Sequence, residues 1–382
     1  MNPQHEVAAI LNQHQSYITT PVFNSWQQRT LFALSKCRTA ALGGHIDKCN
    51  HKGCGQLHLS YNSCRNRHCP KCQGHKTTQW IAKRVEELLP VPYYHVVFTL
   101  PSELNTLALH QSRLIYNTLF KTVWATLKGF GENPTYLGAK MGMICILHTW
   151  GQNLSLHPHL HCIVPAGGVD KQGHWKSVVK KEKYLYPVKQ LSKVFRAKYV
   201  SELRKNGIKN KALFDALFSK EWVVYSKKPF KHATHVVEYL GRYTHKIAIS
   251  NHRIRSISNQ EIRFSAKNYR NKGKKEILKL HPKEFIRRFS LHILPKGFVR
   301  IRHYGFLSST TKRVCLKQLQ EQLGKPKEVK PKLSLHLLCP KCKKGHLETI
   351  LVFDSRGPPK YWLQQLTANK RKKNVTKTVL AY

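Results

Sequence analysis

The sequence predicts an α+β protein in which a split α/β sandwich follows a small cysteine-rich domain and precedes a basic C-terminal region. Three observations favour this class. The middle of the chain gives the order strand, helix, strand, strand, which is typical of a split sandwich rather than a doubly wound sheet. Six of the 11 cysteines fall within residues 37–72, and the chain is rich in lysine and turn-forming residues from residue 323 onward. We therefore expect domains at residues 1–90, 91–310 and 311–382.

Composition and charge indicate which kind of partner the protein binds and in which cellular compartment it is found. The chain has 382 residues, of which 41% are hydrophobic, so it can bury real cores and is not a wholly disordered protein. Its 66 Lys and Arg against 19 Asp and Glu give a net charge of +47, which favours nucleic acid as partner before a membrane surface. No stretch approaches ~18 uninterrupted apolar residues, and the polar start lacks the order of a secretory signal. We expect a cytoplasmic protein whose cysteines are metal ligands or thiols rather than disulfides.

Local patterns divide the chain into helices and strands. Apolar residues at helical spacing, with proline stops, predict the helices, and short β-branched or aromatic runs predict the strands. Helices are expected at residues 25–34, 75–89, 102–127, 187–217, 231–243 and 282–289. Strands are expected at residues 94–100, 143–150 and 159–165, with a turn over 151–158 and a hairpin over 247–265.

The cysteine-rich segment has the spacing of a zinc ribbon. Cys49 and Cys54 form one pair, and a spacer of 14 residues separates them from Cys69 and Cys72. We expect these four thiolates to bind one Zn²⁺, with Cys64 as an alternative ligand. The ion would be structural, because four thiolates leave zinc no open position for catalysis. Zinc binding would contribute ~10–16 kcal/mol to folding, which a segment with little apolar content requires. A second ion remains open, because this segment has further donors, which are Cys37, Cys64, His45, His51, His68 and His75. Residues 339–342 form a lone Cys-x-x-Cys pair, which could be half of another zinc knuckle with His346 and Cys315 as distant partners.

A histidine-rich strand is the first candidate catalytic feature. Residues two apart on a strand point to the same face, so His159 and His161 present two imidazoles together, which suits a divalent metal with open positions. Gln152 on the neighbouring segment is our first candidate for a third ligand, and His157 is the second. Two enzyme classes fit: histidine-triad nucleotide hydrolases and transferases, in which a histidine attacks phosphorus, and metal-dependent single-strand nucleases, in which a tyrosine attacks. A pair of structural histidines at a strand edge is the alternative.

A pair of tyrosines is the second candidate. Tyr239 and Tyr243 are four residues apart, so on a helix they share one face. A tyrosine hydroxyl with a pKa of ~10 is a poor nucleophile at neutral pH, and a metal that polarises the scissile phosphate lowers that demand. Arg242 and Lys246 place cations beside the pair. On spacing alone the tyrosines could equally be aromatic residues at the edge of a core, and only their combination with the histidines favours a catalytic role.

Taken together, these motifs resemble the HUH-type rolling-circle transposases of the insertion-sequence ninety-one group. The resemblance covers about residues 37–304, and its elements stand in the order of that family. They are Cys64-Arg-Asn-Arg-His-Cys69-Pro-Lys-Cys72, Val97-Phe98-Thr99-Leu100-Pro101, His157-Pro-His-Leu-His161, Tyr239-Leu-Gly-Arg-Tyr243-Thr-His and Arg300-Ile-Arg-His-Tyr-Gly305.

The resemblance implies an HUH endonuclease-like fold, an antiparallel-sheet α/β sandwich with an N-terminal zinc-ribbon-like domain. It implies a metal-dependent transposase that cuts one DNA strand, keeps the 5′ phosphate as a phosphotyrosine and releases a 3′ hydroxyl. His159 and His161 would bind Mg²⁺ or Mn²⁺, and Tyr239 and Tyr243 would match the two nucleophiles. The partners would be single-stranded element ends and target DNA in the bacterial nucleoid, with no membrane and no small-molecule substrate.

Three functional alternatives remain at this point. A plasmid replication initiator or a relaxase would use the same chemistry, whereas a non-enzymatic zinc-ribbon DNA-binding protein would have the charge and the cysteines alone. An acid-triad transposase is disfavoured because the chain has only four Asp. For DNA contacts we expect Arg242 and Lys246 beside the tyrosines and Arg300 and Arg302 in the last motif.

Overall fold

The chain forms two compact units, which are described here one at a time. The computed structural model describes residues 3–72, 81, 84–178, 185–230, 236, 247–268, 271, 273–324 and 338–366, without the side chains of 227–229. The first unit contains Met1–Gln73 together with Lys330–Tyr382, and the second contains Gly74–Val329. This division differs from the three consecutive domains expected from the sequence, because the C-terminal segment belongs to the same unit as the N-terminus.

The first unit opens with three short helices, α1 (Val7–Gln13), α2 (Gln15–Ile18) and α3 (Ser25–Ser35). The last of these confirms the expected helix at 25–34, and it begins at a capping box. The Asn24 side chain accepts the backbone N–H of Gln27 at 2.9 Å, and the Gln27 side chain accepts that of Asn24 at 3.0 Å. The buried side chains between α1 and α3 include Ile10, Leu11, Leu31 and Leu34.

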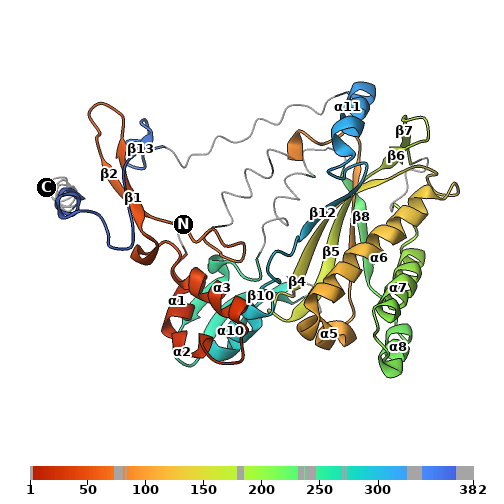
Figure 1. Ribbon diagram of the computed structural model, residues 1–382, viewed down its shortest axis with the longest axis horizontal. Helices are drawn as coiled ribbons and strands as arrows, with labels where there is room; N and C mark the ends of the chain where they lie inside the picture. The colour runs from red at the N-terminus through yellow and green to blue at the C-terminus, as the bar shows by residue number, and fades with distance from the viewer. Residues whose placement is uncertain are drawn as a thin grey trace. The chain divides into compact units, whose positions relative to one another are not determined.

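A three-stranded sheet completes this unit, in the order β13-β1-β2. The 3₁₀ turn η1 (Ala40–Leu42) leads into β1 (Gly44–Cys49), which pairs antiparallel with β2 (Leu57–Tyr61) on one side and with β13 (Leu347–Phe353) on the other. The central strand of an N-terminal sheet is therefore paired along one edge with residues from the other end of the chain, where the sequence indicated a basic region with a Cys-x-x-Cys knuckle (Figure 1).

The second unit is built on a five-stranded antiparallel sheet in the order β12-β4-β5-β3-β8. Its strands are β3 (Tyr93–Thr99), β4 (Gly142–Trp150), β5 (Leu156–Pro165), β8 (Val224–Phe230) and β12 (Ile301–Gly305). The three strands expected at 94–100, 143–150 and 159–165 are confirmed, and they lie side by side at the centre. The expected turn at 151–158 is shorter, because β5 begins three residues earlier than predicted, at Leu156.

One face of this sheet packs against helices, as Figure 1 shows for α6 (Ser112–Glu132) and α7 (Val188–Lys205). Side chains at alternate positions of the strands, such as Val96, Leu147 and Leu160, are buried with Leu119 of α6 and Phe195 of α7. The 3₁₀ turn η2 (Ser102–Leu104), α5 (Asn105–His110) and α8 (Lys211–Phe218) complete this layer.

Both long helices expected here are interrupted. The helix expected at 102–127 is divided into η2, α5 and α6, because the backbone leaves the helical region at Gln111. The helix expected at 187–217 is divided into α7 and α8 after Asn206, where Gly207 adopts a positive φ of 83°. A left-handed glycine is a common helix stop, so this break follows from the sequence Asn-Gly.

The opposite face of the sheet carries a smaller apolar cluster, here called the second core. It includes Ile144 and Ile146 of β4, Ile163 of β5, Leu316 and Leu319 of α11 (Lys312–Leu323), and Val236. Although the sequence assigned α11 to a separate C-terminal region, the helix packs within the second unit. The odd and even residues of β4 therefore face different cores, as a strand period of two requires.

Smaller elements surround the sheet. They are the pair β6 (Gly167–Val169) and β7 (Trp175–Ser177), the 3₁₀ turn η3 (Asn251–Arg253), the sheet of β9 (Ile254–Ile257), β10 (Ile262–Asn268) and β11 (Lys274–Leu280), and α10 (Pro282–Ser290). The expected hairpin over 247–265 is confirmed from residue 254 onward, and α10 confirms the helix at 282–289. Among the described residues, no helix combines the length and the apolar character needed to cross a membrane.

Candidate active site and metal centres

Three histidines meet on the second-core face of the large sheet. His148 comes from β4, and His159 and His161 come from the central strand β5. Their ligand nitrogens all lie within 4.8 Å of one another, with His148 and His161 buried and His159 half-buried. Imidazoles this close can share one divalent cation and leave its remaining coordination positions to substrate oxygens or water.

The strand register places these side chains together. His148 lies directly opposite His159 across the antiparallel pair, and Ile146 lies opposite His161. Directly opposed side chains on one face are ~5 Å apart at Cβ, and His161 follows His159 by one strand period on the same face. The flanking residues Leu147 and Leu160 point to the helix-covered core, so burial of that core fixes the direction of the histidines.

Hydrogen bonds orient the rings of His159 and His161. His159 Nδ1 lies 2.7 Å from the carbonyl oxygen of His157, and His161 Nδ1 lies 2.9 Å from Nε2 of His95, which is buried on β3. A neutral imidazole that donates through Nδ1 presents Nε2 as its acceptor, and such outer contacts commonly fix the tautomer of a metal-binding histidine. The His95 and His161 rings are nearly parallel, at 11°. The geometry therefore fits a preorganised metal centre.

The two residues predicted as the third ligand lie at the start of the strand β5 and in the turn before it. Gln152 is in the turn that follows β4, and its backbone carbonyl oxygen accepts a hydrogen bond from Arg253. His157 is exposed and lies outside the cluster of three, although its carbonyl supports His159. A third imidazole in the cluster comes from His148, which sequence reasoning missed. The available signal was the hairpin register that pairs the two predicted strands.

The tyrosine motif, with Tyr239, Tyr243, Arg242 and Lys246, lies outside the described residues. Val236, three positions before the first tyrosine, is fully buried in the second core. That core occupies the sheet face that carries the three histidines. The chain thus approaches this face immediately before the motif.

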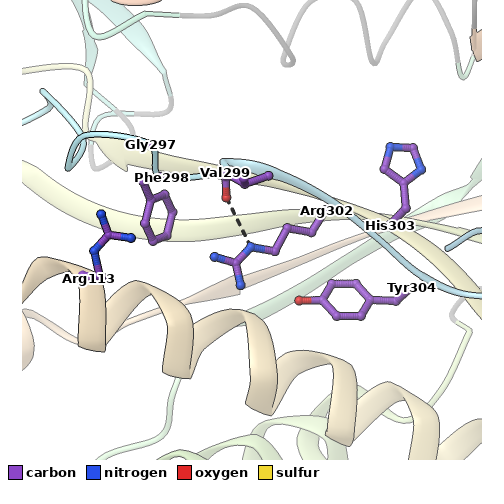
Figure 2. Close-up of a pocket in the computed structure, with 7 residues that line it drawn as sticks. All are labelled: Arg113, Gly297, Phe298, Val299, Arg302, His303 and Tyr304. Carbon is purple, nitrogen blue, oxygen red and sulfur yellow. Dashed lines mark hydrogen bonds between the residues drawn. The ribbon is translucent and has the colours of Figure 1, made fainter. Parts of the chain in front are cut away.

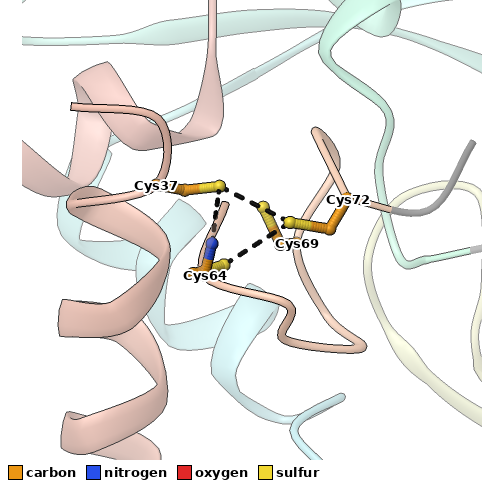
Figure 3. Close-up of side chains that lie close together, drawn as sticks. All are labelled: Cys37, Cys64, Cys69 and Cys72. Carbon is orange, nitrogen blue, oxygen red and sulfur yellow. Dashed lines mark hydrogen bonds between the residues drawn. The ribbon is translucent and has the colours of Figure 1, made fainter. Parts of the chain in front are cut away.

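The first cysteine cluster consists of Cys37, Cys64, Cys69 and Cys72 (Figure 3). The Sγ atoms of Cys37 and Cys72 are 3.5 Å apart, and those of Cys64 and Cys72 are 3.7 Å apart. Thiolates ~2.3 Å from a tetrahedral zinc ion are ~3.8 Å from one another, so this arrangement fits structural zinc. Hydrogen bonds from the thiols of Cys64 and Cys69 lower the pKa of Cys37 to about 7, and the same bonds raise the pKa of Cys64 and of Cys69.

The second cysteine cluster consists of Cys49, Cys54, Cys339 and Cys342. Its Sγ atoms are 3.7 Å apart between Cys49 and Cys342 and 3.9 Å apart between Cys54 and Cys339. Backbone N–H donation, first from Gly345, lowers the pKa of Cys342 to about 6.

The structure therefore divides the single ribbon that the sequence predicted. Cys69 and Cys72 join Cys37 and the alternative ligand Cys64, whereas Cys49 and Cys54 lie in the other cluster. The physical reason is the extended hairpin of β1 and β2, which separates the Cys49–Cys54 turn from the Cys64–Cys72 turn. The spacing of 14 residues matched a ribbon, but it could not show which pairs approach each other.

The two arginines predicted to contact DNA lie at the start of the edge strand β12. Arg300, just before the strand, is buried, at 8% exposure. Arg302 donates to Asn117 at 2.5 Å, and its guanidinium lies 4.2 Å from the ring centre of Phe120. Arg302 also lines an open hollow of about 510 Å³ with Arg113, Gly297, Phe298, Val299, His303 and Tyr304 (Figure 2).

Comparisons with known proteins match both units. A family model described as "Transposase zinc-binding domain" matches residues 9–100, and one described as "Putative transposase" matches residues 142–314. The "Putative transposase y4qJ" of Sinorhizobium fredii is 40% identical over 385 residues, covering 92% of this chain and 94% of the relative. The "Transposase for insertion sequence element IS801" of Pseudomonas savastanoi pv. phaseolicola is 29% identical over 308 residues, covering 75% of this chain and 70% of the relative. No solved structure matches.

Proposed function

This chain belongs to the transposase family of the insertion-sequence ninety-one group, and from that premise we propose that it performs rolling-circle transposition through a covalent phosphotyrosine intermediate. In this proposal the second unit cuts a single DNA strand at the element's end and transfers it to target DNA. The family makes DNA the partner and strand cleavage the reaction. The finer assignment rests on this chain's own residues.

The observation that carries the proposal is the cluster of His148, His159 and His161 on an antiparallel sheet. We assign these residues as the ligands of a catalytic divalent cation, which when bound would polarise the scissile phosphate and stabilise charge in the transition state. Imidazole nitrogens suit transition metals better than they suit Mg²⁺, which prefers oxygen ligands, so the donor set favours Mn²⁺ of the two expected ions. The sheet below the ligands supplies a rigid base.

Tyr239 and Tyr243 are the nucleophiles in this proposal. A tyrosine hydroxyl loses its proton and attacks phosphorus, the bond from phosphorus to the 3′ oxygen breaks, and the departing oxygen takes up a proton as a 3′ hydroxyl. The buried position of Val236 on the histidine-bearing face supports this role, because it brings the chain to that face three residues before Tyr239. Two tyrosines would let one hold the first strand while the other cleaves the next.

The first unit has the proposed role of recognising the element's end. It matches a transposase zinc-binding domain, and its cysteine clusters have closed, all-sulfur donor sets that suit structure rather than catalysis. Since the described structure buries Arg300 and commits Arg302 to Asn117, we assign the DNA-contacting cations to Arg242 and Lys246 beside the tyrosines.

The test is covalent capture of a single-stranded oligonucleotide carrying the element end. The wild-type protein with Mn²⁺ should give an adduct that survives denaturation, and mass spectrometry should place the nucleotide on Tyr239 or Tyr243. The double variant Tyr239→Phe with Tyr243→Phe should lose the adduct completely while it keeps zinc and DNA binding. The control is Tyr225→Phe, because Tyr225 is an exposed tyrosine on β8 of the same sheet. An adduct of undiminished yield in the double variant would refute the nucleophile assignment.

A further inference from the structure

The second cysteine cluster is assembled from distant parts of the chain. Cys49 ends β1 and Cys54 lies in the following turn, whereas Cys339 and Cys342 precede β13. The paired thiols are 285 and 293 residues apart in sequence. The zinc-binding family model ends at residue 100, so it includes only half of this cluster.

The geometry of the four thiols fits one tetrahedral ion. The Sγ–Sγ distances of 3.7 Å and 3.9 Å bracket the ~3.8 Å expected around zinc, and all four sulfurs lie within 4.8 Å of one another. Disulfide bonding would require ~2 Å between sulfurs, and all four cysteines are free thiols. Four thiolates are also the donor set that zinc favours in closed structural sites.

The local sequence repeats that of the first cluster. Residues 339–342 read Cys-Pro-Lys-Cys, as do residues 69–72, which close the first cluster. The Gly345 N–H donates to Cys342 Sγ at 3.3 Å, and the Lys343 N–H donates to the Cys339 carbonyl at 2.8 Å. The first bond stabilises a thiolate at Cys342, and the second closes the turn that carries the two cysteines, so the turn is organised for metal binding.

Gly345 is required by the closeness of the two chain segments. A Cβ atom at this position would lie 2.5 Å from Cys49 Sγ and 2.6 Å from the Cβ of His51, so no larger residue fits without displacement. Hydrogen bonds continue the contact beyond the thiols. Asn50 donates its N–H to the His346 carbonyl at 3.0 Å, and its side-chain oxygen accepts the His346 N–H at 2.8 Å.

We propose that Cys49, Cys54, Cys339 and Cys342 bind a second structural zinc ion, which connects residues 338–366 to the N-terminal part of the first unit. The site is independent of the proposed strand-transfer chemistry, since it shares no residue with the histidine cluster. A link across 285–293 residues restricts the unfolded chain strongly, because the entropy of loop closure grows with the length of the loop. The ion therefore makes the C-terminal segment a permanent part of the zinc-binding unit.

Cobalt substitution of the full chain tests this proposal. Thiolate-to-cobalt charge-transfer absorption reports Co–S bonds alone, so a metal at the histidines contributes nothing to it. Two clusters give eight Co–S bonds, and the variant Cys339→Ser with Cys342→Ser should lose half of the absorption. Cys315→Ser should lose none, because Cys315 is a half-buried cysteine outside both clusters. Full absorption in the double variant would overturn the proposal.

Two further measurements do not depend on the folding of that variant. Native mass spectrometry of the triple variant His148→Ala, His159→Ala and His161→Ala should find two zinc ions, and a single ion would overturn the proposal. Cys342→His, added to this triple variant, keeps a zinc-binding donor, so it should retain two zinc ions in native mass spectrometry, and in the cobalt form it should lose only one of eight Co–S bonds. Loss of an ion in this conservative variant would also count against the assigned ligand set.

Discussion

At the scale of single residues, the ligand set of the histidine cluster can be tested directly. His148→Ala removes one of three imidazole ligands. Losing a residue that only hydrogen-bonds to a ligand costs ~10–100-fold in metal affinity, so losing the ligand itself should weaken Mn²⁺ binding by more than this. Isothermal titration calorimetry with Mn²⁺ measures this loss, and strand cleavage should recover in part at high Mn²⁺.

The matched control is His157→Ala. Its side chain is exposed and is not one of the three clustered imidazoles, although its ring centre lies 5.2 Å from that of His159. The backbone carbonyl that lies 2.7 Å from His159 Nδ1 is kept in this variant. Mn²⁺ affinity should therefore stay at the wild-type value. Equal losses in the two variants would place His157 among the ligands and would contradict the assignment of His148.

Sequence reasoning found some of these residues and missed others for a definite reason. The strand period of two was enough to place His159 and His161 on one face. Identifying His148 needs a pairing register, and in this hairpin paired residue numbers sum to a constant, as 146 with 161 and 148 with 159 do. Gln152 was chosen because it lies on the neighbouring chain segment, and its role as a ligand stays a prediction.

At the scale of elements, the turn between β4 and β5 depends on a buried histidine. His292 Nε2 lies 3.1 Å from the carbonyl of Leu154, and its Nδ1 lies 3.2 Å from the Thr149 hydroxyl. Burial lowers the pKa of His292 to about 4, so the ring is neutral in the folded protein at pH 7.

This shift predicts acid sensitivity of the second unit. Between pH ~6.5 and ~4, His292 is protonated in the unfolded chain but stays neutral in the folded protein. Protonation therefore favours the unfolded state, and the free energy of unfolding should fall by about 3 kcal/mol over this pH range through this group. His292→Gln should remove that part of the pH dependence, whereas the exposed His252→Gln should keep it. Urea unfolding at pH 7 and pH 4.5 measures the difference, and parallel profiles for wild type and His292→Gln would contradict the prediction.

Elements were predicted well where apolar periodicity is strong and poorly where it is absent. The three central strands were found because each is a buried apolar run. Strand β11 was missed because Lys274–Leu280 is mostly exposed and lysine-rich, so its sequence indicates only a solvated basic stretch. Its strand conformation comes from pairing with β10, which a local pattern does not contain.

At the scale of the whole molecule, the net charge of +47 predicts salt-dependent DNA binding. Each phosphate contacted by a Lys or Arg on single-stranded DNA should contribute a slope of about −0.7 to log K against log salt concentration. Fluorescence anisotropy with a labelled single strand across a range of salt concentrations gives this slope. A flat profile would show that the basic residues do not follow the phosphate backbone.

Domain organisation was the least predictable level. The charge and the cysteine-rich segment correctly indicated a zinc-binding domain beside a mixed α/β unit. The pairing of β1 with β13 joins residues about 300 positions apart, and the sequence of neither strand indicates which strand it pairs with. The isolated Cys339–Cys342 pair was the one hint, since half of a four-ligand site requires another half elsewhere.

The pairing of β13 with β1 also determines the order in which the two units can complete their folding during translation. The ribosome makes α1, α2, α3, β1 and β2 first, yet the other edge of β1 waits for β13 until residues 347–353 have emerged. Domains generally fold in the order of their synthesis, but here the unit begun first is completed last. A nascent chain therefore acquires its whole N-terminal unit only after the sheet with the histidine cluster has left the ribosome.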